Sequence, residues 1–394
     1  MGKIVITKRN NRLLLFLMED NRPSLIQVSP ILQEESLLGS IYLAKVKDIV
    51  PGLQAAFLSL SKEKTVFLPL AKNRELLVAN RAYETESVLK QGDEVVVQIT
   101  GEAQKTKPPA ASGALTLTGQ YLVCSYFGHG IAYSKKLTDE KKEEIREVIH
   151  KAEIKNRKKY KFTVRTNAGN LTDFTPMLEE MKHFSDLFET LTISYKHRTC
   201  FSCLYHTEPE ILRQVKGISL TAYEEIVTDE KEVYEVIKEA LPDSPIRFYH
   251  DTMLSLSALY SVETHIKQAL NKKVWLPCGG YLVIEPTEAM VVIDVNSGKG
   301  SAVKNTSGKH LYLKTNLEAA KEIARQLRIR NYSGIIMVDF INMESEKDKN
   351  TLLSELDRYL KEDSIYTRLV DMTALGIVEI TRKKVSKPLD ISLL

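Results

Sequence analysis

Two aspartates, Asp294 and Asp339, each end a short run of aliphatic residues that has the length and composition of a buried strand, at 291–293 and 335–338. Neither aspartate has a basic residue beside it in the sequence. Two carboxylates at close range repel each other unless a divalent cation lies between them, and oxygen ligands favour magnesium or manganese over zinc. Asn296 follows Asp294 by two positions, so it falls on the same side of an extended strand and could add a carbonyl oxygen or orient a water. The pattern therefore predicts a metal site, although an aspartate before Asn-Ser-Gly is also ordinary turn chemistry.

The residues between the two aspartates predict the elements that position them. Apolar residues recur at helical spacing from Leu317 to Leu327, Thr315-Asn316 offers a helix cap, and residues 331–334 offer a stop. A strand-helix-strand unit normally lays its two strands parallel, and ligands bind beyond their carboxyl ends. The two carboxylates would then share one edge of a sheet, next to a tight cationic turn at 297–300.

Three motifs around these residues resemble the ribonuclease E/G family, whose members are bacterial endoribonucleases that cut single-stranded RNA. The motifs are IDVNSGKG, TNLEAAKEIARQLRIRN and IIMVDFINM, and they occur in the order and spacing of that family. The resemblance implies that Asp294 and Asp339 hold Mg²⁺, with Mn²⁺ as a possible substitute, and that Asn296 assists catalysis. It implies an endoribonuclease of RNA processing and decay that leaves 5′-phosphate and 3′-hydroxyl ends.

Closely spaced short strands begin near residue 39 and predict an OB-type barrel. The five predicted strands are 41–46, 54–60, 65–70, 94–100 and 114–118. Such barrels bind single strands by stacking bases on exposed aromatic rings within a cationic groove, although aromatic residues in small barrels more often belong to the core. The candidates are the aromatic residues Tyr42, Phe57 and Phe67 and the basic residues Lys45, Lys47 and Lys107.

The segments GSIYLAKV, PGLQAAF and FLPL resemble the S-one-type barrel of the same family. This resemblance implies RNA binding by Phe57, Phe67 and Lys107. The sequence departs from the family after Lys107, where Pro108-Pro109 stands in place of a glycine and stiffens the loop.

Residues 119–204 alternate between predicted strands and helices, which favours an α/β unit. Within this region VRTNAGN resembles the family's pocket for the 5′-monophosphate of the substrate. The resemblance implies that Arg165 is a bidentate phosphate ligand and Thr166 a hydroxyl donor, a sound pairing for a dianion. On pattern alone an exposed turn is the alternative. A second sensor arginine of the family aligns with Tyr366, and Arg368 lies two positions further on.

The remaining segments predict a scaffold. Residues 1–35 give two strands and a loop with Pro23 and Pro30, and they are too short to fold alone. The family resemblance implies that they complete an RNase H-like layer with partners within 210–273, where periodicity predicts mainly helices, including a long one at 253–270.

The resulting fold class is a multidomain α/β and β protein. Its predicted domains are an RNase H-like scaffold (1–35 with 205–277), the barrel (36–118), a 5′-sensor region (119–204) and a DNase I-like α/β catalytic subdomain (278–394).

Composition bounds the class of protein. The chain has 394 residues, 43% hydrophobic and 27% charged, with a net charge of +4, and no apolar run approaches the roughly 18 residues of a membrane span. No secretory signal is evident, so a cytoplasmic protein is expected. The basic residues at 151–161, and Arg325, Arg328 and Arg330, could neutralise phosphates or form a solvated face.

The cysteines do not predict a zinc site. Cys200 and Cys203 have the spacing of half such a site, and two reduced thiols are the favoured interpretation. The family's Cys-Pro-x-Cys motif, which shares zinc between protomers, does not occur before Leu394. Without this motif, the chain resembles the ribonuclease G branch of the family more closely. We expect a homo-oligomer, and the sequence does not specify its interface.

Two other functions remain open at this point. One is an RNA-binding scaffold without efficient cleavage, although Asp294, Asn296 and Asp339 are all present. The other is a metal-dependent DNA nuclease, which suits the carboxylates but not a single-strand barrel. Competition between single-stranded DNA and RNA separates these possibilities, because a protein that reads the 2′-hydroxyl prefers RNA.

Overall fold

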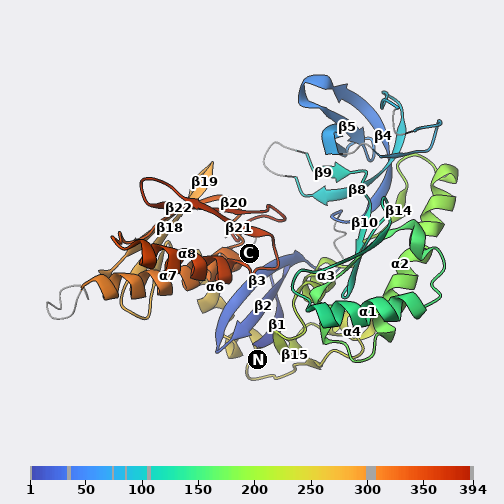
Figure 1. The fold of residues 1–394 in the computed structure, drawn as a ribbon. Helices are drawn as coiled ribbons and strands as arrows, with labels where there is room; N and C mark the ends of the chain where they lie inside the picture. Colours follow the sequence, from blue (N-terminus) through green and yellow to red (C-terminus); the bar gives the residue numbers. More distant parts are fainter. Residues whose placement is uncertain are drawn as a thin grey trace. The chain divides into compact units, whose positions relative to one another are not determined.

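The computed structural model describes residues 2–32, 37–72, 75–84, 87–103, 108–298 and 308–390 (Figure 1). The chain divides into two compact units, one formed by residues 1–32 with 222–394 and the other by residues 33–221. Among the described residues, no helix combines the length and the apolar character needed to cross a membrane.

A five-stranded sheet in the first unit joins the N-terminal segment to later sequence. Its order is β16-β15-β1-β2-β3. The strands are β1 (Gly2–Arg9), β2 (Arg12–Glu19), β3 (Arg22–Pro30), β15 (Tyr223–Thr228) and β16 (Ile246–Phe248). Since β1 pairs in parallel with β15, the prediction that the N-terminal segment finds its partner within 210–273 is confirmed. The predicted loop with Pro23 and Pro30 is wrong: both prolines lie in β3, an edge strand, where a missing N–H is tolerated.

Three helices accompany this sheet: α4 (Lys231–Ala240), α5 (Leu256–Leu259) and α6 (Val262–Leu270). The single helix predicted at 253–270 is wrong, because the chain breaks between α5 and α6 at Ser261, whose φ is 50°. Leu256 and Ile266 from these helices nevertheless pack with Phe16 of β2. The predicted start is also wrong, because α5 begins at Leu256 and Met253 is 96% exposed.

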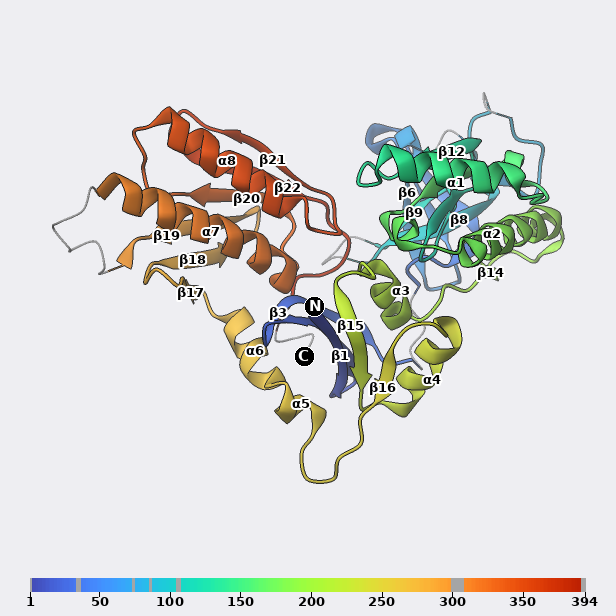
Figure 2. The same ribbon diagram turned by 60° about the horizontal axis from the view of Figure 1, so that its bottom comes forward.

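A six-stranded sheet in the same unit carries the two aspartates. Its order is β17-β18-β19-β20-β22-β21. The strands are β17 (Lys273–Trp275), β18 (Tyr281–Pro286), β19 (Met290–Asn296), β20 (Gly334–Asp339), β21 (Thr367–Met372) and β22 (Ile377–Arg382). Helices α7 (Gly308–Arg330) and α8 (Glu346–Leu360) both lie against one face of this sheet (Figure 2).

Side-chain alternation gives the sheet a buried face and an open face. Val291, Ile293 and Val295 of β19 pack in the core with α7 and α8. Their neighbours Asp294 and Asn296 therefore point to the other face, which we call the open face. In the described part of the chain, the helices of this core cluster pack against the buried face. Polar side chains on the open face therefore remain accessible.

Helix α7 starts earlier than the sequence predicted. It begins at Gly308, so Thr315 and Asn316 lie inside it and are buried, and the predicted cap is wrong. The predicted stop is confirmed, because α7 ends at Arg330 and Asn331 has a φ of 49°.

The second unit contains a closed barrel. Strands pair in the ring β4-β5-β6-β9-β8 and β8 pairs back to β4, which is consistent with an OB-type domain. The strands of this sheet are β4 (Ile41–Val50), β5 (Ala55–Ser59), β6 (Thr65–Pro69), β7 (Leu77–Val78), β8 (Glu94–Gly101), β9 (Ala110–Ser112) and β14 (Cys203–Tyr205). The predicted fifth barrel strand at 114–118 is wrong. Residues 110–112 take that place, and 116–118 pair in another sheet, where the Gln98 side chain binds the backbone of Thr116.

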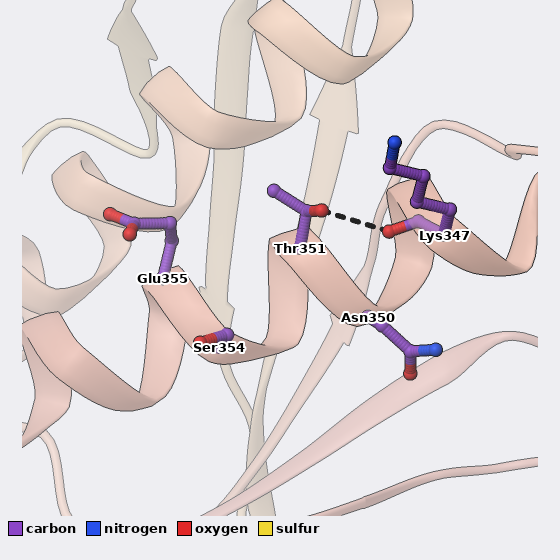
Figure 3. Close-up of a pocket in the computed structure, with 5 residues that line it drawn as sticks. All are labelled: Lys347, Asn350, Thr351, Ser354 and Glu355. Atoms are coloured by element: carbon purple, nitrogen blue, oxygen red, sulfur yellow. Dashed lines mark hydrogen bonds between the residues drawn. The ribbon is translucent and has the colours of Figure 1, made fainter.

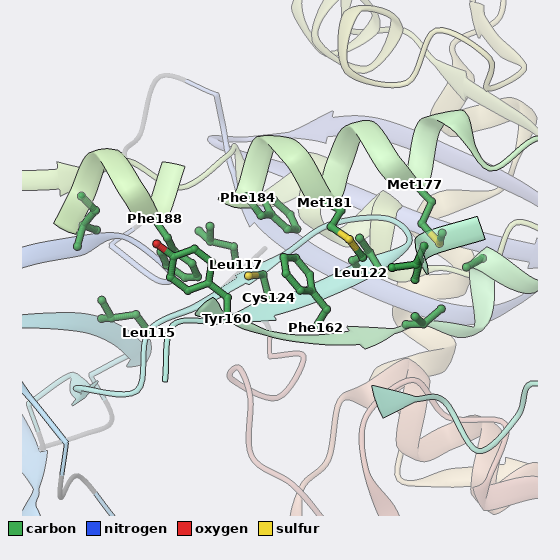
Figure 4. Close-up of a cluster of buried hydrophobic side chains, with 14 of the residues drawn as sticks. Leu115, Leu117, Leu122, Cys124, Tyr160, Phe162, Met177, Met181, Phe184 and Phe188 are labelled. Atoms are coloured by element: carbon green, nitrogen blue, oxygen red, sulfur yellow. The ribbon is translucent and has the colours of Figure 1, made fainter. Parts of the chain in front are cut away.

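That other sheet has the order β10-β11-β13-β12. Its elements and the helices of this region are β10 (Thr116–Thr118), β11 (Leu122–Ser125), β12 (Gly130–Tyr133), β13 (Lys161–Val164), α1 (Asp139–Lys151), α2 (Thr175–Ser194) and α3 (Glu210–Gly217). Figure 4 shows α2 laying Met181 and Phe188 against Phe162 and Cys124. Burial raises the pKa of the Cys124 thiol to about 12, so this cysteine serves the core and is not reactive.

Candidate active site and nucleic-acid interface

Asp294 and Asp339 face each other across two strands of the six-stranded sheet. Strands β19 and β20 are parallel neighbours, and the two aspartates are direct register partners. Neighbouring strands lie about 4.8 Å apart, and both side chains are exposed on the open face. The prediction that the two carboxylates share one edge is confirmed.

Asn296 completes this group on the same face. Its Nδ2 donates a hydrogen bond of 2.7 Å to Oδ2 of Asp294. The chain then turns at Gly298, where φ is 67° and an added Cβ would lie 2.3 Å from the carbonyl oxygen of Gly279. Only glycine fits there, and this tight turn fixes the end of β19 at Asn296.

Asn316 is a positioning residue that the sequence interpretation missed. Its buried side chain donates to the carbonyl oxygen of Ile341 at 2.8 Å and accepts from the N–H of Ile341 at 3.1 Å. Ile341 lies two residues beyond Asp339, so helix α7 holds the segment that follows β20. In the sequence, Thr315-Asn316 resembles a helix cap. Only the hydrogen bonds of Asn316 to Ile341 identify its role.

The donor set at this edge suits a hard cation. In the described part of the chain, no lysine, arginine or histidine forms an ion pair with Asp294 or Asp339. Magnesium is commonly held by one or two carboxylates with waters, whereas structural zinc needs four nitrogen or sulfur ligands. No group of three or more histidines, cysteines or acidic residues gathers among the described residues. Two carboxylates and one amide oxygen therefore fit Mg²⁺ better than zinc.

Phe57 and Phe67 form a cross-strand pair on the barrel. They are register partners on β5 and β6, with ring centroids 5.8 Å apart at 66°. Both rings are half-buried and lie on the face opposite to the barrel core, which takes Ala56 and Leu58 instead. The third aromatic candidate, Tyr42, packs against that core. Two of the three stacking candidates are therefore accessible.

A basic cleft of about 480 Å³ lies beside this aromatic pair. Its lining residues are Lys45, Val46, Lys47, Ser59, Gln91, Gly92 and Phe201. Ser59 follows Phe57 by two positions on β5, so cleft and rings belong to one face of the barrel. Two ammonium groups and accessible aromatic rings together suit a nucleic-acid strand. Lys107, the third predicted RNA ligand, lies outside the described residues.

Arg165 stands at the end of β13 and is half-buried. Its Nη1 donates to the backbone carbonyls of Gly119, Gln120 and Lys216. Burial lowers the pKa of this guanidinium, although an arginine remains charged at neutral pH. The side chain is thus a rigid part of the loop that precedes β11.

The same loop is held from its other side by Glu180. This carboxylate accepts from the backbone N–H groups of residues 120–122 at 2.6, 3.0 and 2.7 Å. Burial raises the pKa of Glu180, and those three hydrogen bonds oppose the rise. Thr166 follows Arg165 and shares a hydrogen bond of 2.9 Å with the hydroxyl of Ser134. Arg165 and Thr166 therefore lie in a built polar region rather than in a loose turn.

The chain is similar to known proteins over most of its length. The model of the ribonuclease E/G family matches residues 116–385, which include the sheet of Asp294 and Asp339. The chain belongs to the ribonuclease E/G family. It is 32% identical to ribonuclease E of Synechocystis sp. over 356 residues, which cover 88% of this chain and 52% of that protein. It is 29% identical to ribonuclease E of Nostoc sp., over 98% of this chain and 56% of that protein. Ribonuclease G of Escherichia coli K12 is 28% identical over 90% of this chain and 74% of its own length.

The chain spans about half the length of the ribonuclease E relatives it matches. The barrel lies outside the residues that the family model matches, yet the alignment with the Nostoc protein covers 98% of the chain and so includes it. The similarity to ribonuclease E of Nostoc sp. therefore includes the barrel.

The arginines of α7 do not form a phosphate-binding cluster in this ribonuclease E/G chain. Arg330 is 2% exposed and donates through Nε to Gln326 at 2.6 Å, and Arg325 pairs with Glu322 at 2.6 Å. Arg328 donates to backbone carbonyls. These side chains tie α7 to its surroundings. Of the basic residues at 151–161, Lys151 and Lys159 pair with surface carboxylates, Lys159 with Glu189 at 3.1 Å.

A surface depression along α8 is not a convincing site. Figure 3 shows that its lining comes from one helix: Lys347, Asn350, Thr351, Ser354 and Glu355. The only hydrogen bond drawn there joins the Thr351 hydroxyl to the Lys347 carbonyl at 2.8 Å. Since α8 covers the buried face of the sheet, this depression does not belong to the edge that carries Asp294. Cys200 and Cys203 are free thiols and add no candidate site.

Proposed function

We propose that this chain is a magnesium-dependent endoribonuclease that cleaves single-stranded RNA in RNA processing and decay. The observation that carries the proposal is the register pairing of Asp294 with Asp339 on parallel strands, with Asn296 hydrogen-bonded to Asp294 on the same open face. The names ribonuclease E and ribonuclease G of its relatives support the reaction class.

Each residue of the group has a distinct role in this proposal. Asp294 and Asp339 hold Mg²⁺, which when bound supplies charge neutralisation of the phosphodiester and a reactive water at neutral pH. Asn296 has one amide N–H committed to Asp294, which turns its amide plane and leaves the carbonyl oxygen to orient a water. The expected products carry 5′-phosphate and 3′-hydroxyl ends.

The direct test is cleavage of a short single-stranded RNA with Mg²⁺ or with a chelator. We expect cutting with Mg²⁺ or Mn²⁺ and none with the chelator, and a single-stranded DNA of the same sequence should compete poorly. Tight RNA binding without any cutting would instead identify an RNA-binding scaffold, and equal cutting of DNA would identify a general nuclease.

We propose that the barrel binds the RNA strand through Phe57, Phe67 and Lys107. Replacing Phe57 with alanine should weaken RNA binding about 5- to 150-fold, because one stacked base contributes about 1–3 kcal/mol. The measurement is the anisotropy of a labelled RNA in chelator, so that cleavage does not interfere. Leu53→Ala is the matched control, since Leu53 is a 63% exposed apolar residue of the same barrel. Equal losses in both variants would contradict a stacking role.

We propose that Arg165 and Thr166 bind the 5′-monophosphate of the substrate. The expected result is faster cleavage of an RNA with a 5′-monophosphate than of the same RNA with a 5′-hydroxyl, and loss of that preference in Arg165→Gln. Because Arg165 also holds the loop at Gly119, the 5′-hydroxyl substrate serves as the internal control. If the rates on both substrates fall together in the variant, the arginine is structural and not a phosphate ligand.

We also propose that the protein is a cytoplasmic homo-oligomer. Sedimentation across a range of protein concentrations measures the oligomeric state, and a monomer at every concentration would reject this part of the proposal.

A further inference from the structure

The only tryptophan of the chain, Trp275, lies on the surface instead of in the core. Its side chain is 64% exposed, although tryptophan is normally among the more buried residues. Its strand neighbours Val274 and Leu276 take the core positions against α7 and α8, so Trp275 points to the open face.

Trp275 belongs to an aromatic and cationic cluster on the edge strand β17 and its neighbour β18. Its ring centroid lies 5.3 Å from that of Tyr281, with the two planes at 61°. The ammonium of Lys273 lies 3.6 Å from the Tyr281 centroid and 4.1 Å from the Trp275 centroid. Lys273 forms no ion pair with a carboxylate in the described chain, whereas its neighbour Lys272 pairs with Glu285. Its charge is therefore available to a phosphate.

Strand register connects this cluster to the carboxylates. Trp275 pairs with Tyr281, and Tyr281 pairs with Asn296, so these three side chains form one row across the open face. In the next row Lys273 pairs with Val283, and Val283 pairs with Asp294. One strand spacing, about 5 Å, separates Tyr281 from Asn296, and two, about 10 Å, separate Lys273 from Asp294.

We propose that Trp275, Tyr281 and Lys273 form a nucleotide subsite that stacks one base of the RNA strand and contacts its phosphate, beside the bond that is cut. This inference rests on the proposed function, because the strand must lie across Asp294 and Asp339. The two aromatic rings can stack on any base, because every base has a π-face, and the ammonium group can bind the adjoining phosphate. A surface for binding another protein does not require an ammonium group without a carboxylate partner above both rings. The subsite would fix the strand on the side of β17 and so help to set which phosphodiester faces the carboxylates.

The position of Trp275 supplies a direct readout. Since it is the only tryptophan in the sequence, tryptophan emission, excited at a wavelength where the tyrosines do not absorb, reports this subsite alone. We expect single-stranded RNA to quench the emission of Asp294→Asn protein in chelator, where no cleavage occurs. An RNA with one abasic nucleotide, moved along the strand, should lose the quenching at one position. RNA that binds by anisotropy without any change in emission would overturn the proposal.

Variants give the second measurement. Trp275→Ala in the otherwise unchanged chain should raise KM for a short RNA about 5- to 150-fold and shift the cleavage position, while Trp275→Phe should restore most of the affinity. The control is Ile335→Ala, a 51% exposed apolar residue on the open face at the far end of β20. Unchanged KM and unchanged cut sites in Trp275→Ala would overturn the subsite.

The outcomes separate this proposal from the proposed function. Cleavage by the unchanged chain with no fluorescence response rejects the subsite and keeps the nuclease. Quenching at one base without any cleavage rejects the nuclease and keeps the nucleotide site. An emission change that follows protein concentration without RNA identifies a contact between copies of the chain and rejects the subsite.

Discussion

Asp294→Asn is expected to lower the rate of RNA cleavage by more than about 100-fold, and Asp339→Asn by a similar factor. The loss of an outer partner of a metal ligand typically costs about 10- to 100-fold, so the loss of a direct carboxylate ligand should exceed that range. The measurement is single-turnover cleavage of a labelled RNA at saturating Mg²⁺. The two aspartates are register partners and act as one unit, so the double variant should be no slower than the slower single variant.

RNA binding should survive these substitutions. Each one removes a negative charge from the open face, so affinity for the polyanionic strand in chelator should stay the same or increase slightly. A weaker affinity would instead indicate damage to the fold. Glu379→Gln is the matched control, because Glu379 lies on β22, the neighbour of β20, and the change removes the same charge. Normal cleavage by Asp294→Asn, or an equal loss in Glu379→Gln, would reject the carboxylate pair as the active site.

Asn296→Ala should show a smaller loss than either aspartate variant. Its side chain donates to Asp294 and would orient a water without carrying negative charge. A loss as large as that of Asp294→Asn would mean that the amide itself holds the cation.

The placement of the two aspartates was predictable because it depends on local order. Two strand-like runs that end in aspartate, with a helical period between them, leave few arrangements, and the parallel pairing of β19 with β20 is the common one. The helical face from Leu317 to Leu327 was also correctly read, since that period reflects burial in one core.

The features that the sequence did not reveal depend on contacts with residues far away in the chain. Asn316 resembles a cap by residue type, and only its hydrogen bonds to Ile341, 25 positions away, give it a role. The arginines of α7 resemble a phosphate-binding face, yet Arg330 is buried and bound to Asn271. The last barrel strand was predicted four to six residues too late, because short strands carry little pattern, and the pairing of residues 110–112 with β8 identifies the correct segment.

A buried ion pair joins the segments that support β20. Asp363 follows α8, and its Oδ2 lies 2.8 Å from Nε of Arg382 on β22. Their side chains are 5% and 1% exposed. Nη1 of Arg382 also donates to Asn331 Oδ1 at 2.9 Å and to the carbonyl of Tyr332 at 3.0 Å, in the turn that leads into β20. One guanidinium thus holds three segments around the strand of Asp339.

Asp363→Asn is therefore expected to lower the unfolding free energy of this unit by about 3–5 kcal/mol, because it leaves the Arg382 charge buried without its partner. The measurement is the urea midpoint by circular dichroism at unchanged m-value. The matched control is Asp357→Asn on α8, which breaks a surface pair with Lys361 and should cost less than about 1 kcal/mol. Comparable small losses in both variants would show that solvent reaches Arg382 and that the three segments are held by their apolar contacts. A large loss for Asp363→Asn alone, with cleavage still normal at low temperature, would separate the stability of the sheet from the chemistry of the carboxylates that it carries.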